Sequence, residues 1–318
     1  MSKGSYKLLK KIASLIARLK YRNVPEPYFY FFRDTIVCKM VQLKYFFRDY
    51  LFKSKYKTID FSGEFGNEMQ FALPHAYWHY KNGTLKATRS FPHTKELYFF
   101  SDNHSEFHTE RTNAGNYNFE LPRILYSQDY DIKKWLPVPF KSHFKNDIYR
   151  YEKPLLIIAN RYNTEWDGPP VSYFSKDVLD QIISRLKDRY QIIYSRPQAK
   201  DIVNDNSAIY DLKEFEWLKS RHPEVIHLND LYKENKIKAR NFNHFQLCVY
   251  ANCENFISIH GGTATLASYF GGKNLIFSKK GPEHYFQCYR KFYPQFSGAA
   301  IHHAATEDTL FQYVDDLF

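Results

Sequence analysis

The sequence lacks any run of apolar residues that approaches the roughly 20 needed to cross a lipid bilayer as a helix. It also lacks a recognisable secretory signal, because lysines interrupt every candidate apolar core near the N-terminus, namely Lys3, Lys7, Lys10 and Lys11. These absences argue against an integral membrane protein with helical spans and against a secreted protein. We therefore expect a cytoplasmic location.

Cysteine is scarce, and its spacing is uninformative for metal binding. The four cysteines form no CxxC pair and no zinc-ligand pattern, so we expect reduced, buried thiols. No GxGxxG follows any expected strand, which argues against a dinucleotide-dependent oxidoreductase. The sequence thus predicts neither a bound metal nor a cofactor.

The chain is long enough to bury a large hydrophobic core. It has 318 residues, of which 44% are hydrophobic, and this size suggests two domains.

The positive charge is confined to one segment. Residues 1–57 contain 14 Lys and Arg against 3 Asp and Glu, whereas the other 261 residues contain 31 of each sign. Proteins that bind nucleic acids usually carry their basic residues across a folded face. We therefore expect no nucleic-acid partner and look for another role of residues 1–57.

The N-terminal segment has the pattern of an amphipathic helix. Apolar residues recur at helical spacing at Leu8, Leu9, Ile12, Leu15, Ile16 and Leu19. Basic residues occupy the other side at Lys7, Lys10, Lys11 and Arg18. Pro25 and Pro27 end this helix, and an aromatic stretch follows over Tyr28–Phe52. A basic amphipathic helix beside aromatic residues predicts a peripheral anchor on an anionic membrane, and the alternative is a helical hairpin packed on the body of the protein.

Beyond residue 57, short strands and helices alternate, which predicts parallel sheets with right-handed crossovers. We expect three parts: a helical extension over 1–57, an α/β domain over 58–150 and a second α/β domain over 151–318. Strands are expected at Lys57–Phe61, Leu85–Ala87, Leu97–Phe100, Pro154–Ala159, Gln191–Tyr194, Val225–Leu228, Asn255–Ile259 and Asn274–Phe277. Helices are expected at about Asn67–Tyr80, Val178–Tyr190, His244–Cys253 and Thr263–Phe270.

In parallel sheets, ligands bind beyond the carboxyl ends of the strands. The strand Asn255–Ile259 is followed by two glycines and two threonines, in the order His260, Gly261, Gly262, Thr263, Ala264 and Thr265. Glycines let the backbone approach a bulky anion, and the first turn of the next helix offers free N–H groups. Two further strand ends carry arginines that would suit a phosphate, in Asn160-Arg161 and Ser195-Arg196. The alternative for these arginines is an ordinary surface position.

At this point a family resemblance emerges. The segment Phe256–Gln287 resembles the donor-site segment of inverting GT-B glycosyltransferases, with a strand, a Gly-Gly turn, a Thr-Leu helix, a second strand and a loop carrying Glu, His and Gln. The stretches GGTATLASYFGG and ANRYNTEWDGPP are similar to transferases of bacterial capsule and O-antigen clusters. The turn Gly63–Met69 resembles the glycine-rich first turn of several fucosyltransferase families.

The resemblance implies a GT-B-like fold, in which two Rossmann-like domains face a cleft, and an enzyme that transfers a sugar from a nucleotide-sugar to a glycan or lipid-linked acceptor. Relatives carry an acidic ribose contact in the helix after the turn. Here no acid lies between Thr263 and Gly272, so Glu283 is the substitute candidate. The expected donor-binding set is Asn160, Arg161, Arg196, His260, Gly261, Gly262, Thr263, Thr265 and Glu283. Inversion of the anomeric centre and independence of metal are expected.

An inverting transfer needs a general base for the acceptor hydroxyl. We rank Glu64 first because it lies inside the first glycine turn, and we keep Glu68 and His104 as further candidates. Two other functions stay open. Asp129 and Asp131 have the spacing of a metal-binding Asp-x-Asp of a GT-A transferase, and the chain could also be a non-catalytic, membrane-associated nucleotide or glycan binder.

Overall fold

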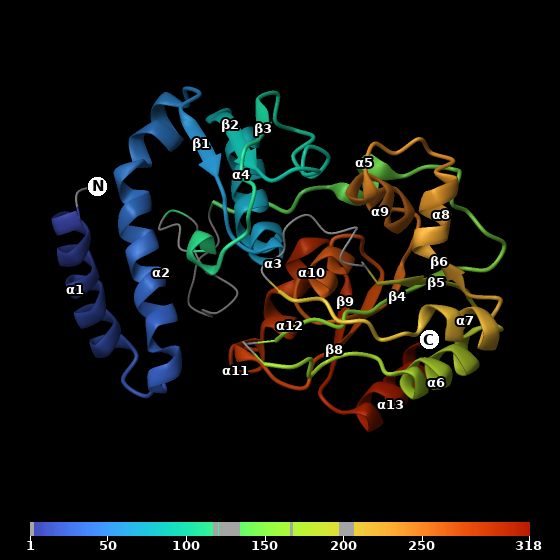
Figure 1. Ribbon diagram of the computed structural model, residues 1–318. Coiled ribbons are helices and arrows are strands. Elements are labelled where there is room, and N and C mark those ends of the chain that lie inside the picture. Colours follow the sequence, from blue (N-terminus) through green and yellow to red (C-terminus); the bar gives the residue numbers. More distant parts are fainter. Residues whose placement is uncertain (1–2, 117–119, 121–133, 166–167, 197–206) are drawn as a thin grey trace.

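The computed structural model describes residues 3–116, 120, 134–165, 168–196 and 207–318, and Figure 1 gives its arrangement. The strands form two separate sheets in which neighbouring strands run parallel. The α/β class expected from the sequence, with parallel sheets and a helical N-terminal extension, is confirmed.

The smaller sheet belongs to the first half of the chain and the larger sheet to the second. The three-stranded sheet has the order β1-β2-β3, with strands at Lys57–Asp60, Leu85–Ser90 and His104–Glu106. The six-stranded sheet has the order β6-β5-β4-β7-β8-β9. Its strands, in chain order from β4 to β9, are Leu155–Ala159, Gln191–Ser195, Ile226–His227, Asn255–Ile259, Lys273–Phe277 and Ala300–Ala304.

Helices connect the strands and form the N-terminal extension. In the first half they are α1 (Lys3–Lys20), α2 (Glu26–Lys44), the π-helix η1 (Arg48–Phe52), α3 (Phe65–Asn67), the π-helix η2 (Glu68–Ala72), α4 (Leu73–Lys81), η3 (Asn113–Asn116) and α5 (Phe140–Phe144). In the second half they are α6 (Lys176–Leu186), α7 (Phe215–Arg221), α8 (Leu228–Glu234), α9 (Phe242–Tyr250), α10 (Gly262–Ser268), α11 (Pro282–Tyr285), α12 (Cys288–Lys291), η5 (Tyr293–Phe296) and α13 (Glu307–Leu317).

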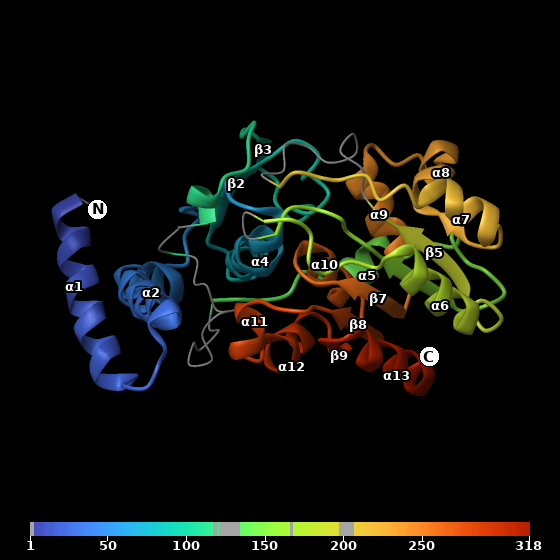
Figure 2. The same cartoon turned by 60° about the horizontal axis from the view of Figure 1, so that its bottom comes forward.

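The N-terminal extension is a helical hairpin. Pro25 lies in the link between α1 and α2, and Pro27 lies in the first turn of α2, where its missing N–H costs no helical hydrogen bond. Figures 1 and 2 both place α1 at the outer edge of the molecule, with α2 between it and the sheets. Among the described helices, none combines the length and apolarity that crossing a bilayer requires.

One expected strand is wrong, and two observed strands were not expected. The expected strand at Leu97–Phe100 is wrong, because these residues form turns in which the Leu97 and Tyr98 N–H groups both bond the Thr94 carbonyl. Their apolar run reflects burial in the core and not strand pairing. Strands β3 and β9 lie at sheet edges, and the sequence analysis missed them because polar and small residues leave no apolar run there.

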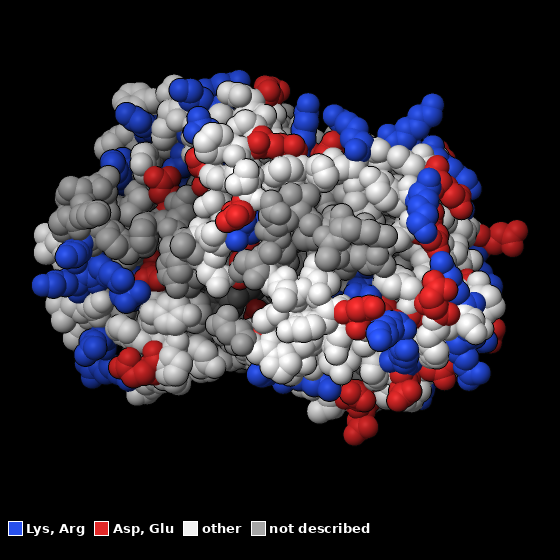
Figure 3. Space-filling model, in the orientation of Figure 1, with Lys and Arg blue, Asp and Glu red and all other residues white. Residues whose placement is uncertain are grey.

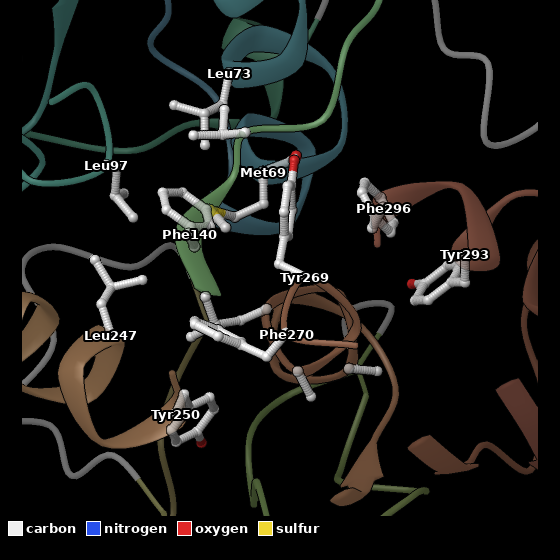
Figure 4. Packing of buried hydrophobic residues seen from close by; sticks show 14 of the residues in the cluster. Met69, Leu73, Leu97, Phe140, Leu247, Tyr250, Tyr269, Phe270, Tyr293 and Phe296 are labelled. Atoms are coloured by element: carbon white, nitrogen blue, oxygen red, sulfur yellow. The ribbon is translucent and has the colours of Figure 1, made fainter. Parts of the chain in front are cut away.

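Both faces of the larger sheet are covered, as a continuous apolar strand such as β4 requires. Leu156 and Ile158 of β4 face α6 and α13, whereas Leu155, Ile157 and Ala159 face α9 and α10. The second of these clusters continues into the first half of the chain. Figure 4 shows the junction, where Met69 and Leu73 meet Phe140 and the two aromatic residues Tyr269 and Phe270.

Polar contacts reinforce this junction. The Tyr269 hydroxyl donates to the Met69 carbonyl at 2.6 Å, and the Trp135 indole donates to the Gln70 carbonyl at 2.7 Å. Both carbonyls belong to η2. The two sheets therefore share one hydrophobic core.

Candidate functional site

The two glycine turns singled out in the sequence are in contact. A Cβ atom on Gly66 would lie 3.3 Å from the Gly262 nitrogen, and one on Gly262 would lie 3.1 Å from Cδ1 of Phe65. The first turn follows β1 and the second follows β7, so the contact joins the carboxyl end of one sheet to that of the other. Glycine at both positions allows the backbones to approach this closely. The junction is therefore where a ligand bound by one half would meet side chains of the other.

Arg161 lies directly over the second turn. Gly261 has a φ of +82°, and a Cβ atom there would lie 2.7 Å from Nη1 of Arg161. The guanidinium is half-buried and donates from Nη2 to the Thr164 carbonyl at 3.4 Å. Among the described residues no carboxylate lies within 4.0 Å of it as an ion-pair partner. Within the described residues, most of its N–H donors thus have no protein acceptor beside Gly261.

Asn160 explains how Arg161 is held in place. The Asn160 amide donates to the Phe174 carbonyl and the Tyr194 hydroxyl, both at 3.0 Å. Its Oδ1 accepts from the Arg161 N–H at 2.9 Å and from the Phe174 N–H at 3.0 Å. The side chain is fully buried, and these contacts use its two donors and its acceptor. Asn160 therefore fixes the chain direction at the end of β4.

His260 and Glu165 form a buried pair next to Arg161. Nε2 of His260 lies 3.2 Å from Oε2 of Glu165, and Oε1 of Glu165 accepts from the Ser172 N–H at 3.1 Å. Burial acts to raise the pKa of Glu165, but the contacts of His260, the Ser172 N–H and the charge of Arg161 together hold it below its ordinary value. Glu165 is a site residue that the sequence analysis missed. It belongs to the ANRYNTEWDGPP stretch, but nothing in the sequence pairs it with a histidine 95 residues away.

The two threonines of the turn have different positions. Thr265 is fully buried, donates to the Gly261 carbonyl at 2.9 Å and accepts from the Gln70 amide at 2.9 Å. Its hydroxyl thus joins the two halves and is already engaged. Thr263 is half-buried in the first turn of α10, where the N–H groups have no partner within the helix.

Arg196 is engaged elsewhere. Both its Nε and its Nη2 bond the Glu214 carboxylate, the latter at 3.0 Å, and both residues are almost completely buried. The Tyr194 hydroxyl donates to the same carboxylate at 3.1 Å. The charge of Arg196 is therefore neutralised inside the protein, and the structure does not bring it to the junction.

Glu283 is buried and lines a hollow of about 470 Å³. The hollow is lined by side chains from α11, α12, β9 and α13, chiefly Glu283, His284, Gln287, Arg290, His303 and Tyr313. Burial lowers the pKa of His284 to about 4, and the neighbouring His303 and His260 contribute to that lowering. Burial lowers the pKa of His303 as well. These histidines are therefore neutral at pH 7 and act as hydrogen-bonding groups, as the 3.0 Å contact of His284 with Ser278 illustrates.

Of the three candidate bases, the structure brings only Glu64 to the junction. Glu64 precedes Phe65 and Gly66, is half-buried and accepts from the Asn67 amide at 3.1 Å. Glu68 is fully buried and bonds the guanidinium of Arg111 at 2.7 Å.

The other hydrogen bonds of Glu68, and those of His104, are made to residues of the first half of the chain. Glu68 also accepts from Ser90 and, at 2.9 Å, from Tyr98. The two ring nitrogens of His104 contact Thr88 at 2.8 Å and Thr94 at 3.0 Å. Both candidates are thus hydrogen-bonded to protein partners within the first half, and Glu68 is so bonded although it lies in the Gly63–Met69 stretch itself.

The metal-binding alternative lies outside the described residues, since Asp129 and Asp131 fall in the range 121–133. Among the residues that are described, no group of three or more His, Cys, Asp or Glu side chains is arranged to hold a metal ion. The four cysteines are buried and unpaired with one another.

Comparisons with known proteins give one remote similarity. No protein-family model and no curated protein sequence matches the chain. Among solved structures, the chain is similar to the E. coli heptosyltransferase WaaC with ADP, at 10% sequence identity and a TM-score of 0.37. The similarity covers 87% of this chain and 78% of that one.

Proposed function

We propose that the chain is a glycosyltransferase, which moves a sugar from a nucleotide-sugar donor to a glycan or lipid-linked acceptor during the synthesis of surface polysaccharide. The observation that carries this proposal is the contact between the two glycine turns, with the Arg161 guanidinium over Gly261. A diphosphate needs a backbone that it can approach and a fixed positive charge, and both are present at this point. The second half of the chain thus binds the donor and the first half faces the acceptor.

The donor site consists of Gly261, Gly262 and Thr263, whose N–H groups contact the diphosphate, and Arg161, which neutralises it. Asn160 positions Arg161. His260 stays in the set because it follows β7 directly before Gly261 and pairs with Glu165, and Glu283, which lines the hollow, is the candidate for the ribose hydroxyls. Thr265 and Arg196 take structural roles in this proposal, because their polar groups already have protein partners.

The proposed chemistry is a direct displacement with inversion. Glu64 removes the proton from the acceptor hydroxyl, and the resulting oxygen nucleophile forms a bond to the anomeric carbon. The bond from that carbon to the diphosphate breaks on the opposite face, and the electron pair leaves with the diphosphate. Arg161 and the backbone N–H groups stabilise the charge that develops there. No metal is required for this step, so chelation by EDTA should leave turnover intact.

We further propose that the protein acts on the cytoplasmic face of a membrane as a peripheral protein, with residues 1–57 contacting anionic lipid. This location would bring the enzyme to lipid-linked acceptors.

The metal-independent mechanism is also tested by chelation. Loss of activity in EDTA would favour the GT-A alternative, in which Asp129 and Asp131 hold a metal ion.

A thermal-shift screen with UDP, GDP, CDP, dTDP and ADP tests the donor proposal. A nucleoside diphosphate at 100 times its dissociation constant should add about 2.7 kcal/mol to the free energy of unfolding. Hydrolysis or transfer of the matching nucleotide-sugar then separates an enzyme from a non-catalytic binder. The proposal fails if none of the five nucleotides stabilises the full-length protein.

A further inference from the structure

The large apolar side chains of α1 face away from the protein. At about 100° per residue, Leu8, Ile12, Leu15, Ile16 and Leu19 share one face of the helix. They are between 41% and 62% exposed. The opposite face is the one that packs on α2, and it is made by the small residues Ala13 and Ala17, which are fully buried. In a hairpin that merely packed on the body, the leucines and isoleucines would point inward.

A second apolar group surrounds η1 at the end of α2. Its members are Leu43, Phe46, Phe47, Tyr50, Leu51 and Phe52, which are between 38% and 73% exposed. Phe46 packs on Phe47 and Tyr50 with ring centroids 5.7 and 5.0 Å apart, so these rings form one continuous patch. Apolar patches of this extent on a protein surface mark a contact with a partner or a membrane.

Positive charge accompanies both groups. Lys7, Lys11, Arg18 and Arg22 are exposed and follow one flank of the α1 face. Lys44, Arg48, Lys53 and Lys55 are exposed around η1. Figure 3 shows Lys and Arg atoms along the hairpin, at the left and upper left of that view. Apolar residues bordered by lysine and arginine match the interfacial layer of an anionic bilayer, where side chains enter the acyl boundary and cations meet headgroups.

The hairpin is firmly attached to the rest of the chain, so the exposed faces are fixed in direction. Tyr28 stacks on Tyr285 with centroids 4.3 Å apart, and Phe31 and Phe32 both contact Phe286. Within η1, the Asp49 carbonyl accepts from the Asn82 amide at 2.7 Å. The exposed side chains therefore do not belong to a loose tail that could fold back on the body.

We propose that the outer face of α1 and the patch around η1 form one rigid surface that inserts into anionic bilayers by two separate apolar contacts. This deepens the membrane association included in the proposed function by naming the residues that insert. A second copy of the chain fits this surface less well than a bilayer does, because it would bring two rows of like charges together. Each apolar contact adds to the attraction between the basic residues and lipid headgroups, so loss of either one weakens binding.

Flotation of the full-length protein with phosphatidylcholine vesicles, with or without phosphatidylglycerol, tests the proposal. The first variant carries Leu8→Ser, Leu15→Ser and Leu19→Ser. The second carries Phe47→Ser, Leu51→Ser and Phe52→Ser. Each should reduce the partition coefficient on phosphatidylglycerol vesicles at least tenfold, and higher salt should weaken the binding of the unaltered protein. All six residues are exposed, so the variants should melt at or near the temperature of the unaltered protein.

The matched control replaces exposed apolar residues remote from the hairpin, as Phe107→Ser and Ile148→Ser, and should bind vesicles unchanged. Equal partitioning of all variants overturns the proposal. A lipid-free dimer that the serine variants convert to monomer overturns it as well and assigns the surface to a second copy. Nucleotide binding by the same variants is measured in parallel. If the unaltered protein binds vesicles but no nucleotide, the membrane surface is supported and the donor site is wrong. If it binds a nucleotide but no vesicles, the donor site is supported and only the membrane surface is wrong.

Discussion

Arg161 is the residue on which the donor site depends most. Replacing it by Ala removes a charge-assisted contact worth roughly 1.5–3 kcal/mol, so the affinity for a nucleoside diphosphate should fall at least tenfold. Arg161→Lys keeps the charge but loses the planar fork and should recover part of the affinity. Isothermal titration of the full-length variants measures both effects. Arg185→Ala is the control, because Arg185 pairs with the exposed Asp315 far from the turns, and it should bind normally. An Arg161→Ala protein with unaltered affinity would place the diphosphate elsewhere.

Glu64 and Glu68 are four residues apart but differ in role. Glu64 is the proposed base at the junction, and Glu68 forms a buried ion pair with Arg111. Glu64→Gln should lower kcat by about 10² to 10⁴ with little change in donor affinity, because it removes the proposed base and keeps the shape. Glu68→Gln should instead lower the free energy of unfolding, since it leaves the buried guanidinium of Arg111 without its counter-charge. Steady-state kinetics and urea unfolding of both variants test this contrast. Normal turnover of Glu64→Gln would remove it as the base.

At the scale of elements, η1 is held by a buried ion pair. Asp49 is 1% exposed, bonds the ammonium of Lys134 and accepts from the Tyr56 hydroxyl at 2.6 Å. Asp49→Asn keeps the shape but leaves Lys134 as an uncompensated buried charge. The free energy of unfolding should fall by about 3–5 kcal/mol, measured by urea denaturation.

Two further variants check the cause of that loss. Adding Lys134→Met to Asp49→Asn removes the unpaired charge and should restore much of the stability. Asp60→Asn is the surface comparison, because the Asp60 side chain is 43% exposed and should contribute less than about 1 kcal/mol. If the single and double variants at the buried pair were equally stable, the pair would not hold η1.

For the whole molecule, buried neutral histidines predict instability in acid. Burial, reinforced by the nearby Lys57 charge, lowers the pKa of His75 from 6.5 to about 3, and that of His284 falls to about 4. Between pH 6.5 and these values the unfolded chain binds more protons than the folded one, so stability falls as the pH falls. Each such histidine adds a slope of at most about 1.4 kcal/mol per pH unit.

His75→Asn tests this slope. The asparagine amide can keep the donor that His75 offers to the Lys134 carbonyl at 2.9 Å, but it does not titrate. Unfolding by urea at pH 6.5, 5.5 and 4.5 should show a shallower loss of stability in the variant than in the unaltered protein. Parallel curves for the two proteins would mean that His75 is not the group that takes up the proton.

Much of the fold was determined by the sequence alone. Apolar runs bounded by turn residues identified β4, β5, β7 and β8, because strands buried on both faces cannot tolerate polar residues. The hydrophobic period and two prolines identified α1 and its end. The glycine turns were also visible, since a strand, a pair of glycines and a helix follow one another directly along the chain. These features are local, so they can be read from neighbouring residues.

Only the tertiary structure decided which polar groups remain available. Glu64 and Glu68 lie in the same Gly63–Met69 stretch, and Arg161 and Arg196 both follow a strand end. The structure places one member of each pair at the junction and bonds the other to a buried partner. The pairing of Glu165 with His260 and the outward direction of the α1 leucines were decided in the same way. Such outcomes depend on which surfaces meet across long stretches of chain. Local periodicity contains no information about those contacts, because they form only when the elements pack.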